Sequence, residues 1–167
     1  MKTIRPGTLD RLGLAGRLLL TSDGTVMPML EQIVGERVVT AGLRQSAAPV
    51  DPGEAALFDH PGPALVTRTT HLVGAVTGTV YVRARSVLCP DAMPDALRAD
   101  LLTTAAPIGR LLRGHRVESF REILSMRVPG DDGRPAEPSR RYLVFIGGRP
   151  ALLIEETFTA ECFSYTA

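Results

Sequence analysis

The sequence is poor in the residues that form disulfides or bind metals. Its 167 residues contain two cysteines and three histidines. Cys89 and Cys162 stand far apart without a CxxC pair, and the histidines lack the short spacing of metal ligands. The sequence therefore predicts neither a disulfide scaffold nor a metal site.

Long apolar runs and an excess of one charge are also missing. The longest apolar runs, such as Leu18-Leu19-Leu20, are far too short to span a bilayer, and the first residues lack the apolar core of a signal peptide. The formal net charge is +1, from 19 basic and 18 acidic residues, and the basic residues are spread along the chain. We expect a cytoplasmic protein, a monomer or small homo-oligomer, with neither a membrane nor a nucleic-acid partner.

Three familiar functional motifs are absent as well. The sequence has no GxSxG nucleophile elbow, no Walker-type phosphate loop and no GxGxxG that opens a helix after a strand. With nucleotide and metal motifs both missing, we expect a protein that works without a cofactor.

What is present is a mixture of helix and strand patterns without regular βαβ alternation. The helices expected from apolar spacing and breakers cover 8–20, 26–34 with Thr25 as N-cap and Gly35 as the end, 94–104, and 108–113. The expected strands cover 37–44, 65–73, 79–88, 115–128, 140–146 and 149–158, with irregular connections at 45–63 and 129–139. This order predicts a single α+β domain over residues 1–167 with an antiparallel sheet, in which the mixed faces of 115–128 suit either an edge strand or a strand over a polar cavity.

The run 149–158 carries the most informative residue. One face of this strand would carry Leu152, Ile154, Glu156 and Phe158. If that face is interior, Glu156 must be paired, protonated or functional, because an isolated buried charge is too costly. The alternative is a solvated face with Glu156 at the surface. The neighbouring Glu155 is the other candidate carboxylate, although it lies on the opposite face.

A second polar residue and two helix ends complete the candidate site. Arg68 lies between apolar and small neighbours of the strand 65–73, and the helices that begin near Val26 and Ile108 present free N–H groups at their first turns. Met27 is the alternative to Val26. These groups would suit a small, flat, anionic and partly apolar ligand. The alternative is that Arg68 and Glu156 form an ion pair with each other or with other side chains.

Five short motifs in order resemble those of the chorismate pyruvate-lyases, and they cover nearly the whole chain. They are Leu19–Val26, Thr67-Arg68, Ala84–Val87, Ala106–Gly109 and Leu153–Phe158. The resemblance implies a single domain with a six-stranded antiparallel sheet, helices packed on it, and an enclosed site that converts chorismate to 4-hydroxybenzoate and pyruvate without a cofactor. It also implies that Arg68 and Glu156 are the essential residues, and that Val26 and Ile108 bind substrate through the main chain.

The resemblance leaves the precise function open. A close analogue of chorismate, such as isochorismate or an amino-substituted chorismate, is an alternative substrate. A non-catalytic sensor of a small carboxylate is a second possibility, because the effector-binding domains of some transcription regulators resemble this fold. We expect the enzyme, since Arg68 and Glu156 are both retained and the sequence shows no DNA-binding helix-turn-helix.

Overall fold

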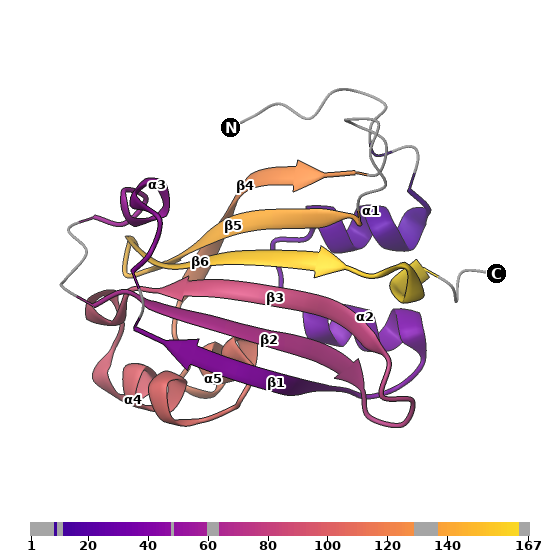
Figure 1. Ribbon diagram of the computed structural model, residues 1–167, viewed down its shortest axis with the longest axis horizontal. Helices are drawn as coiled ribbons and strands as arrows, with labels where there is room; N and C mark the ends of the chain where they lie inside the picture. The colour runs from indigo at the N-terminus through magenta and orange to yellow at the C-terminus, as the bar shows by residue number, and fades with distance from the viewer. Residues whose placement is uncertain (1–8, 10–11, 48, 60–63, 129–136, 164–167) are drawn as a thin grey trace.

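Six strands form one antiparallel sheet in the order β1-β2-β3-β6-β5-β4 (Figure 1). The structure is a computed structural model that describes residues 9, 12–47, 49–59, 64–128 and 137–163. The strands are β1 (Val38–Ser46), β2 (Val66–Gly74), β3 (Val80–Leu88), β4 (Ser119–Arg127), β5 (Ser139–Ile146) and β6 (Arg149–Phe158). The predicted α+β class with an antiparallel sheet is therefore confirmed.

Two hairpins and an edge strand follow the sequence pattern. β2 and β3 pair as the predicted hairpin. The β5–β6 turn consists of Gly147 and Gly148, whose φ angles of 56° and 78° are left-handed and favour glycine. β4 pairs with β5 and lies at the edge of the described sheet, which is one of the two positions that its mixed faces suggested.

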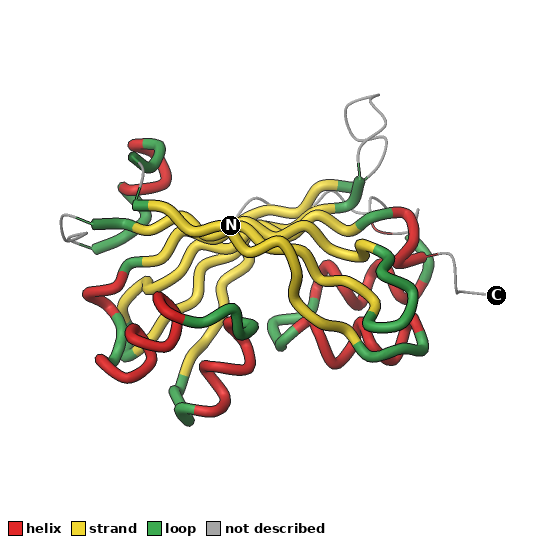
Figure 2. Tube along the Cα trace, turned by 60° about the horizontal axis from the view of Figure 1, so that its bottom comes forward, coloured by secondary structure: helices red, strands yellow, loops and turns green. Residues whose placement is uncertain are grey.

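Four of the helices cover one face of the sheet. They are α1 (Leu14–Thr21), α2 (Val26–Val34), α4 (Asp95–Thr103) and α5 (Ile108–Gly114). Figure 2 shows them as two groups below the sheet, with α1 and α2 under one end and α4 and α5 under the other. Two 3-10 turns, Pro90–Ala92 and Ala160–Phe163, complete the described helical elements. No helix among the described residues is long and apolar enough to cross a membrane.

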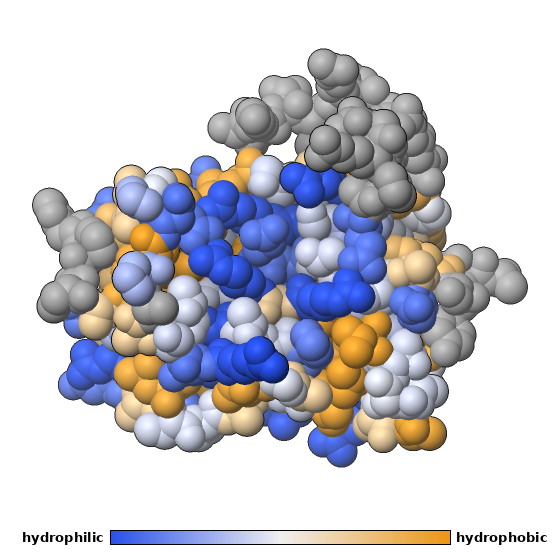
Figure 3. Space-filling model, viewed as in Figure 1, coloured by the Kyte–Doolittle hydropathy of each residue, from blue (hydrophilic) through white to orange (hydrophobic). Residues whose placement is uncertain are grey.

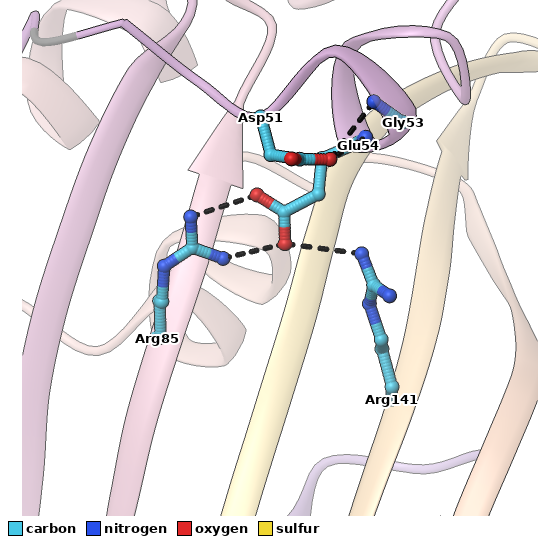
Figure 4. A network of polar contacts seen from close by, with 5 residues as sticks. All are labelled: Asp51, Gly53, Glu54, Arg85 and Arg141. Atoms are coloured by element: carbon cyan, nitrogen blue, oxygen red, sulfur yellow. Dashed lines mark hydrogen bonds and ion pairs between the residues drawn. The ribbon is translucent and has the colours of Figure 1, made fainter.

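The opposite face of the sheet is mostly hydrophilic (Figure 3). Of the described helices, the short α3 (Pro52–Ala55) alone lies on it (Figure 2). The Glu54 carboxylate of α3 accepts two hydrogen bonds from Arg85, both 2.7 Å, and one of 3.0 Å from Arg141 (Figure 4). These contacts, chiefly the one with Arg85, lower the pKa of Glu54. Glu54 therefore ties α3 to strands β3 and β5.

Several predicted boundaries are wrong. The first helix begins at Leu14 rather than at residue 8, because Gly13 occupies the N-cap position; residues 8, 10 and 11 lie outside the described residues. The 45–63 connection is not irregular throughout, since β1 continues to Ser46 and Asp51 caps α3. β4 begins at Ser119 rather than at 115, because Arg116 has a φ of 53° at the turn after α5. Most of the predicted 129–139 connection lies outside the described part.

The apolar core consists of two clusters that correspond to the two helix groups. One is centred on α1, α2 and the neighbouring ends of β2, β3 and β6, and the other on α4, α5, β5 and β6. Four polar or charged residues on the inner face of the sheet are also buried: Arg68, Ser86, Arg140 and Glu156. Because buried charges are costly without partners, these residues mark the part of the core where function is to be sought.

Candidate active site

The floor of the candidate site is formed by three neighbouring strands. Arg68 on β2 pairs with Ser86 on β3, and Glu156 on β6 pairs with Ala84 on β3. Since β2 and β6 flank β3, these two strands are about 10 Å apart, and the two-residue offset along β3 brings the separation of the Arg68 and Glu156 backbones to roughly 12 Å. The small side chains of Ala84 and Ser86 lie between them and leave room above the sheet for a flat group.

Arg68 is a buried cation bonded to main-chain carbonyls. Its side chain is 2% exposed, Nη1 donates to the Leu101 carbonyl at 2.9 Å, and Nη2 donates to the Ala106 carbonyl at 2.7 Å. Nε has no partner, and among the described residues no carboxylate pairs with Arg68. Burial of this uncompensated charge lowers the pKa of Arg68. An anionic ligand would supply the missing counter-charge.

Glu156 is buried and held by two hydrogen-bond donors. Its Oε2 accepts from Arg140 Nε at 2.7 Å, and its Oε1 accepts from the Tyr142 hydroxyl at 3.1 Å. Glu155, its sequence neighbour, is exposed. The predicted assignment of Glu156 to the apolar face is confirmed, and the surface alternative is wrong. Both oxygens of the carboxylate therefore act as hydrogen-bond acceptors.

Tyr142 is a donor rather than a base. Burial, together with the charge of Glu156, raises the pKa of its phenol far above the usual value. The hydroxyl therefore keeps its proton and points it at Oε1 of Glu156.

Arg140 connects Glu156 to the loop before α2. Its Nη1 donates to the Ser22 carbonyl, and its guanidinium carbon lies 5.0 Å from the centre of the Tyr142 ring and 5.9 Å from that of Phe158. Nη2 is buried without a partner. Glu156 is therefore paired with Arg140, and the pairing of Arg68 with Glu156 that the sequence left open is not formed.

Two helix N-termini face each other across the site. Thr25 and Pro107 occupy the N-cap positions of α2 and α5, and neither helix has a side-chain cap. Thr25 thus stands where the sequence predicted a cap, but its side chain does not make the capping bond. A Cβ built on Gly109 would lie 2.6 Å from Cγ2 of Thr25, so glycine is what permits this close approach. The uncapped N–H groups of both first turns remain open to a ligand.

These groups converge on one cavity. Its volume is about 80 Å³. All five residues predicted for the site line it: Arg68, Glu156, Val26, Met27 and Ile108. Other lining residues include Thr40, Thr70, Leu112, Arg121, Tyr142 and Ile154. Members of both apolar clusters contribute, so the cavity lies where the two clusters meet.

Comparisons with known proteins identify the family. The family model described as Chorismate pyruvate-lyase Rv2949c-like matches residues 20–165. The chain belongs to this family. Curated chorismate pyruvate-lyases of Mycobacterium leprae (strain TN) and Mycobacterium tuberculosis (strain ATCC 25618 / H37Rv) are each 26% identical to it over 161 residues. The alignments cover 90% of this chain and 76% of the M. leprae protein, and 88% of this chain and 80% of the M. tuberculosis protein.

A solved structure supports the fold alone. The crystal structure of PhnF from Mycobacterium smegmatis has a TM-score of 0.56 and 12% sequence identity, and the likeness covers 88% of this chain and 68% of that chain. At this identity the likeness says nothing about the ligand.

Sequence reasoning missed three polar residues of this chorismate pyruvate-lyase family member. Arg140, Tyr142 and Arg121 lie on β5 and β4, and all three side chains are at or beside the cavity. The alternation of β5 places Arg140 and Tyr142 on one face with Val144 and Ile146, which was a usable signal. The contact of Arg140 with Glu156 depends on strand register, which the pattern did not supply.

Proposed function

We propose that this protein is a chorismate pyruvate-lyase that converts chorismate to 4-hydroxybenzoate and pyruvate in the cavity between Arg68 and Glu156. Chorismate carries a carboxylate on a cyclohexadiene ring, an enolpyruvyl ether at C3 and a hydroxyl at C4. When the C4–H and C3–O bonds break, the ring becomes aromatic and the hydrogen ends on the enolpyruvyl fragment, which becomes pyruvate. Aromatisation supplies the driving force, so the protein mainly selects a conformer and stabilises charge.

Arg68 is assigned to the ring carboxylate. The side chain is fixed by the carbonyls of Leu101 and Ala106 and has no carboxylate partner among the described residues. The N–H groups at the start of α2 and α5, near Val26 or Met27 and Ile108, would complete the anion site. The ring would then lie over Ala84 and Ser86, toward Glu156.

Glu156 is assigned to the C4 side of the ring. With Arg140 and Tyr142 donating to its two oxygens, it can accept a hydrogen bond from the C4 hydroxyl or take the C4 hydrogen as a proton. Deuterium at C4 distinguishes the routes: direct transfer to the enolpyruvyl methylene carries the label into the methyl group of pyruvate, whereas transfer through Glu156 allows exchange with water.

The observation that carries the proposal is the pairing state of the two charged residues. Glu156 has its counter-ion in Arg140, whereas Arg68 has none among the described residues. A family member with an unpaired arginine and a charged acceptor on either side of a small-residue floor has the groups that the elimination requires.

The test is incubation of the purified protein with chorismate, with pyruvate and 4-hydroxybenzoate both quantified. We expect equal amounts of the two products, and loss of turnover in Arg68→Ala but not in Arg83→Ala, which removes an exposed arginine of the outer face. Turnover of isochorismate or an amino-substituted chorismate in place of chorismate would reassign the substrate. Tight binding of 4-hydroxybenzoate without turnover of any of them would favour the non-catalytic sensor and refute the lyase.

A further inference from the structure

A second arginine that has no acidic partner in the described part of the chain reaches the cavity from the far edge of the sheet. Arg121 lies on the edge strand β4, lines the cavity and is half-buried. Its described hydrogen bond, 3.1 Å long, runs from Nη1 to the main-chain carbonyl of Asp23. Within the described part of the chain, no carboxylate pairs with Arg121. Its positive charge therefore faces the cavity uncompensated.

The four charged side chains at and beside the cavity have a net charge of +2. Arg140 and Glu156 form an ion pair and cancel. Arg68 and Arg121 remain, each bonded to main-chain carbonyls alone among its described partners. A ligand with a single carboxylate would compensate one of these cations. A dicarboxylate would compensate both.

The two cations approach from opposite sides. Arg68 stands on β2 and Arg121 on β4, with β3, β6 and β5 between them in the sheet. Arg121 lies opposite Val144 in the sheet, and Val144 is the neighbour of Tyr142 on the inner face of β5. The Arg121 side chain therefore reaches the cavity from the same side as Tyr142, which donates to Glu156. Consider a ring whose carboxylate contacts Arg68 and whose hydroxyl contacts Glu156. A substituent on the ring carbon next to that hydroxyl would then point toward Arg121.

We propose that Arg121 binds the second carboxylate of the substrate, the one on the enolpyruvyl ether, and so makes the site selective for dicarboxylates. The assignment rests on the proposed function, because that function places the ether at the carbon next to the C4 hydroxyl. Arg121 would hold the leaving fragment through the elimination and lose its ligand when pyruvate departs, while Arg68 still holds the aromatic product. Arg121 is thus a specificity-determining residue for the substrate and not for 4-hydroxybenzoate.

The test compares two stable ligands that differ by one carboxylate. The diacid is 3-(1-carboxyvinyloxy)benzoate, which is already aromatic and cannot eliminate, and the monoacid is 3-methoxybenzoate. Their dissociation constants are measured by calorimetry for the wild type, Arg121→Gln and Arg127→Gln. Arg127 is an exposed arginine on the same strand, so its substitution removes the same charge away from the cavity.

We expect Arg121→Gln to weaken the diacid roughly 10- to 100-fold, as loss of a charge-assisted contact does, with the monoacid changed less than about twofold. Arg127→Gln should change neither ligand by more than about twofold. Equal weakening of both ligands, or of neither, would overturn the assignment. Turnover of chorismate is not needed for this comparison, so a protein that binds as expected but does not turn chorismate over refutes the lyase and leaves the dicarboxylate site standing.

Discussion

Replacement of Glu156 by glutamine separates the structural role of this residue from its chemical role. Glu156 and Arg140 form a buried ion pair, with side chains that are 7% and 1% exposed. Glutamine keeps the shape and one acceptor oxygen but removes the charge, so that Arg140 becomes a buried cation without a counter-ion. Glu155→Gln removes the same charge from the exposed face of the same strand and is the matched control.

The two substitutions should differ in stability as well as in activity. Loss of one partner from a buried pair costs several kcal/mol, and since glutamine retains a hydrogen bond we expect about 3 kcal/mol for Glu156→Gln. Glu155→Gln should cost about 0.5 kcal/mol or less. Turnover of chorismate should fall on the order of 10²- to 10⁴-fold in Glu156→Gln alone, the usual range for a lost proton-transfer group.

A double variant tests the pair directly. Arg140→Gln should also cost about 3 kcal/mol, whereas Arg140→Gln with Glu156→Gln should be no less stable than either single variant, a coupling of about 3 kcal/mol. The free energies of unfolding come from urea titration and the rates from release of pyruvate. Additive losses in the double variant would show that no charged pair forms. Loss of activity in Glu155→Gln rather than Glu156→Gln would show that the strand register is wrong, and recovery of turnover in the double variant would remove Glu156 from the chemistry.

Three further predictions concern other residues of the site and the fold. Arg68→Ala should weaken 4-hydroxybenzoate binding roughly 10- to 100-fold by calorimetry, with little recovery in Arg68→Lys because an ammonium lacks the bidentate fork; unchanged affinity would place the carboxylate elsewhere. Gly109→Ala would bring a methyl group to 2.6 Å from Cγ2 of Thr25, so it should weaken the same ligand, and Thr25→Ser, which removes that carbon, should restore it; no rescue would mean that the helix contact is unimportant. Hydrogen bonds from Thr77 and Tyr81 lower the pKa of Glu36 from 4.5 to about 2. The ionised Glu36 therefore stabilises the folded state fully above pH 4.5, and this stabilisation is lost as the pH falls toward 2. The stability difference between wild type and Glu36→Gln should shrink over that interval in denaturant titrations, and a constant difference would contradict the shift.

The order and type of the secondary-structure elements followed from local patterns. Two-residue alternation identified β2, β3 and β6, and the glycines at 35, 147 and 148 mark the end of a helix and a hairpin turn, each with positive φ. The start of a helix was harder to predict from the sequence. Helix α1 begins at Leu14 after Gly13, which has no side chain that could form a capping hydrogen bond. Helix α3 was missed because it has only four residues and depends on Glu54 reaching across to Arg85 and Arg141.

Burial of Glu156 followed from its apolar neighbours, but its partner did not. Arg140 and Arg141 are adjacent, as are Glu155 and Glu156, and alternation alone does not say which arginine meets which carboxylate. In the sheet Arg140 pairs with Glu156 on the inner face, and Arg141 lies opposite Glu155 on the outer face, where its side chain bonds to Glu54. The chemistry of the site therefore depends on a long-range register.

That register is set by a turn and an irregularity together. Beyond the turn, Ile146 pairs with Arg149 and Phe145 with Pro150, but Val144 pairs with Leu152, so Ala151 is the extra residue of a bulge. The carbonyl of Ala151 accepts a hydrogen bond from the N–H of Cys89, just after β3, which gives the displaced residue a partner of its own. Without the bulge, the spacing of the turn would continue and bring Arg140 opposite Glu155. The extra residue Ala151, next to the turn, thus decides which of the two carboxylates lies opposite Arg140.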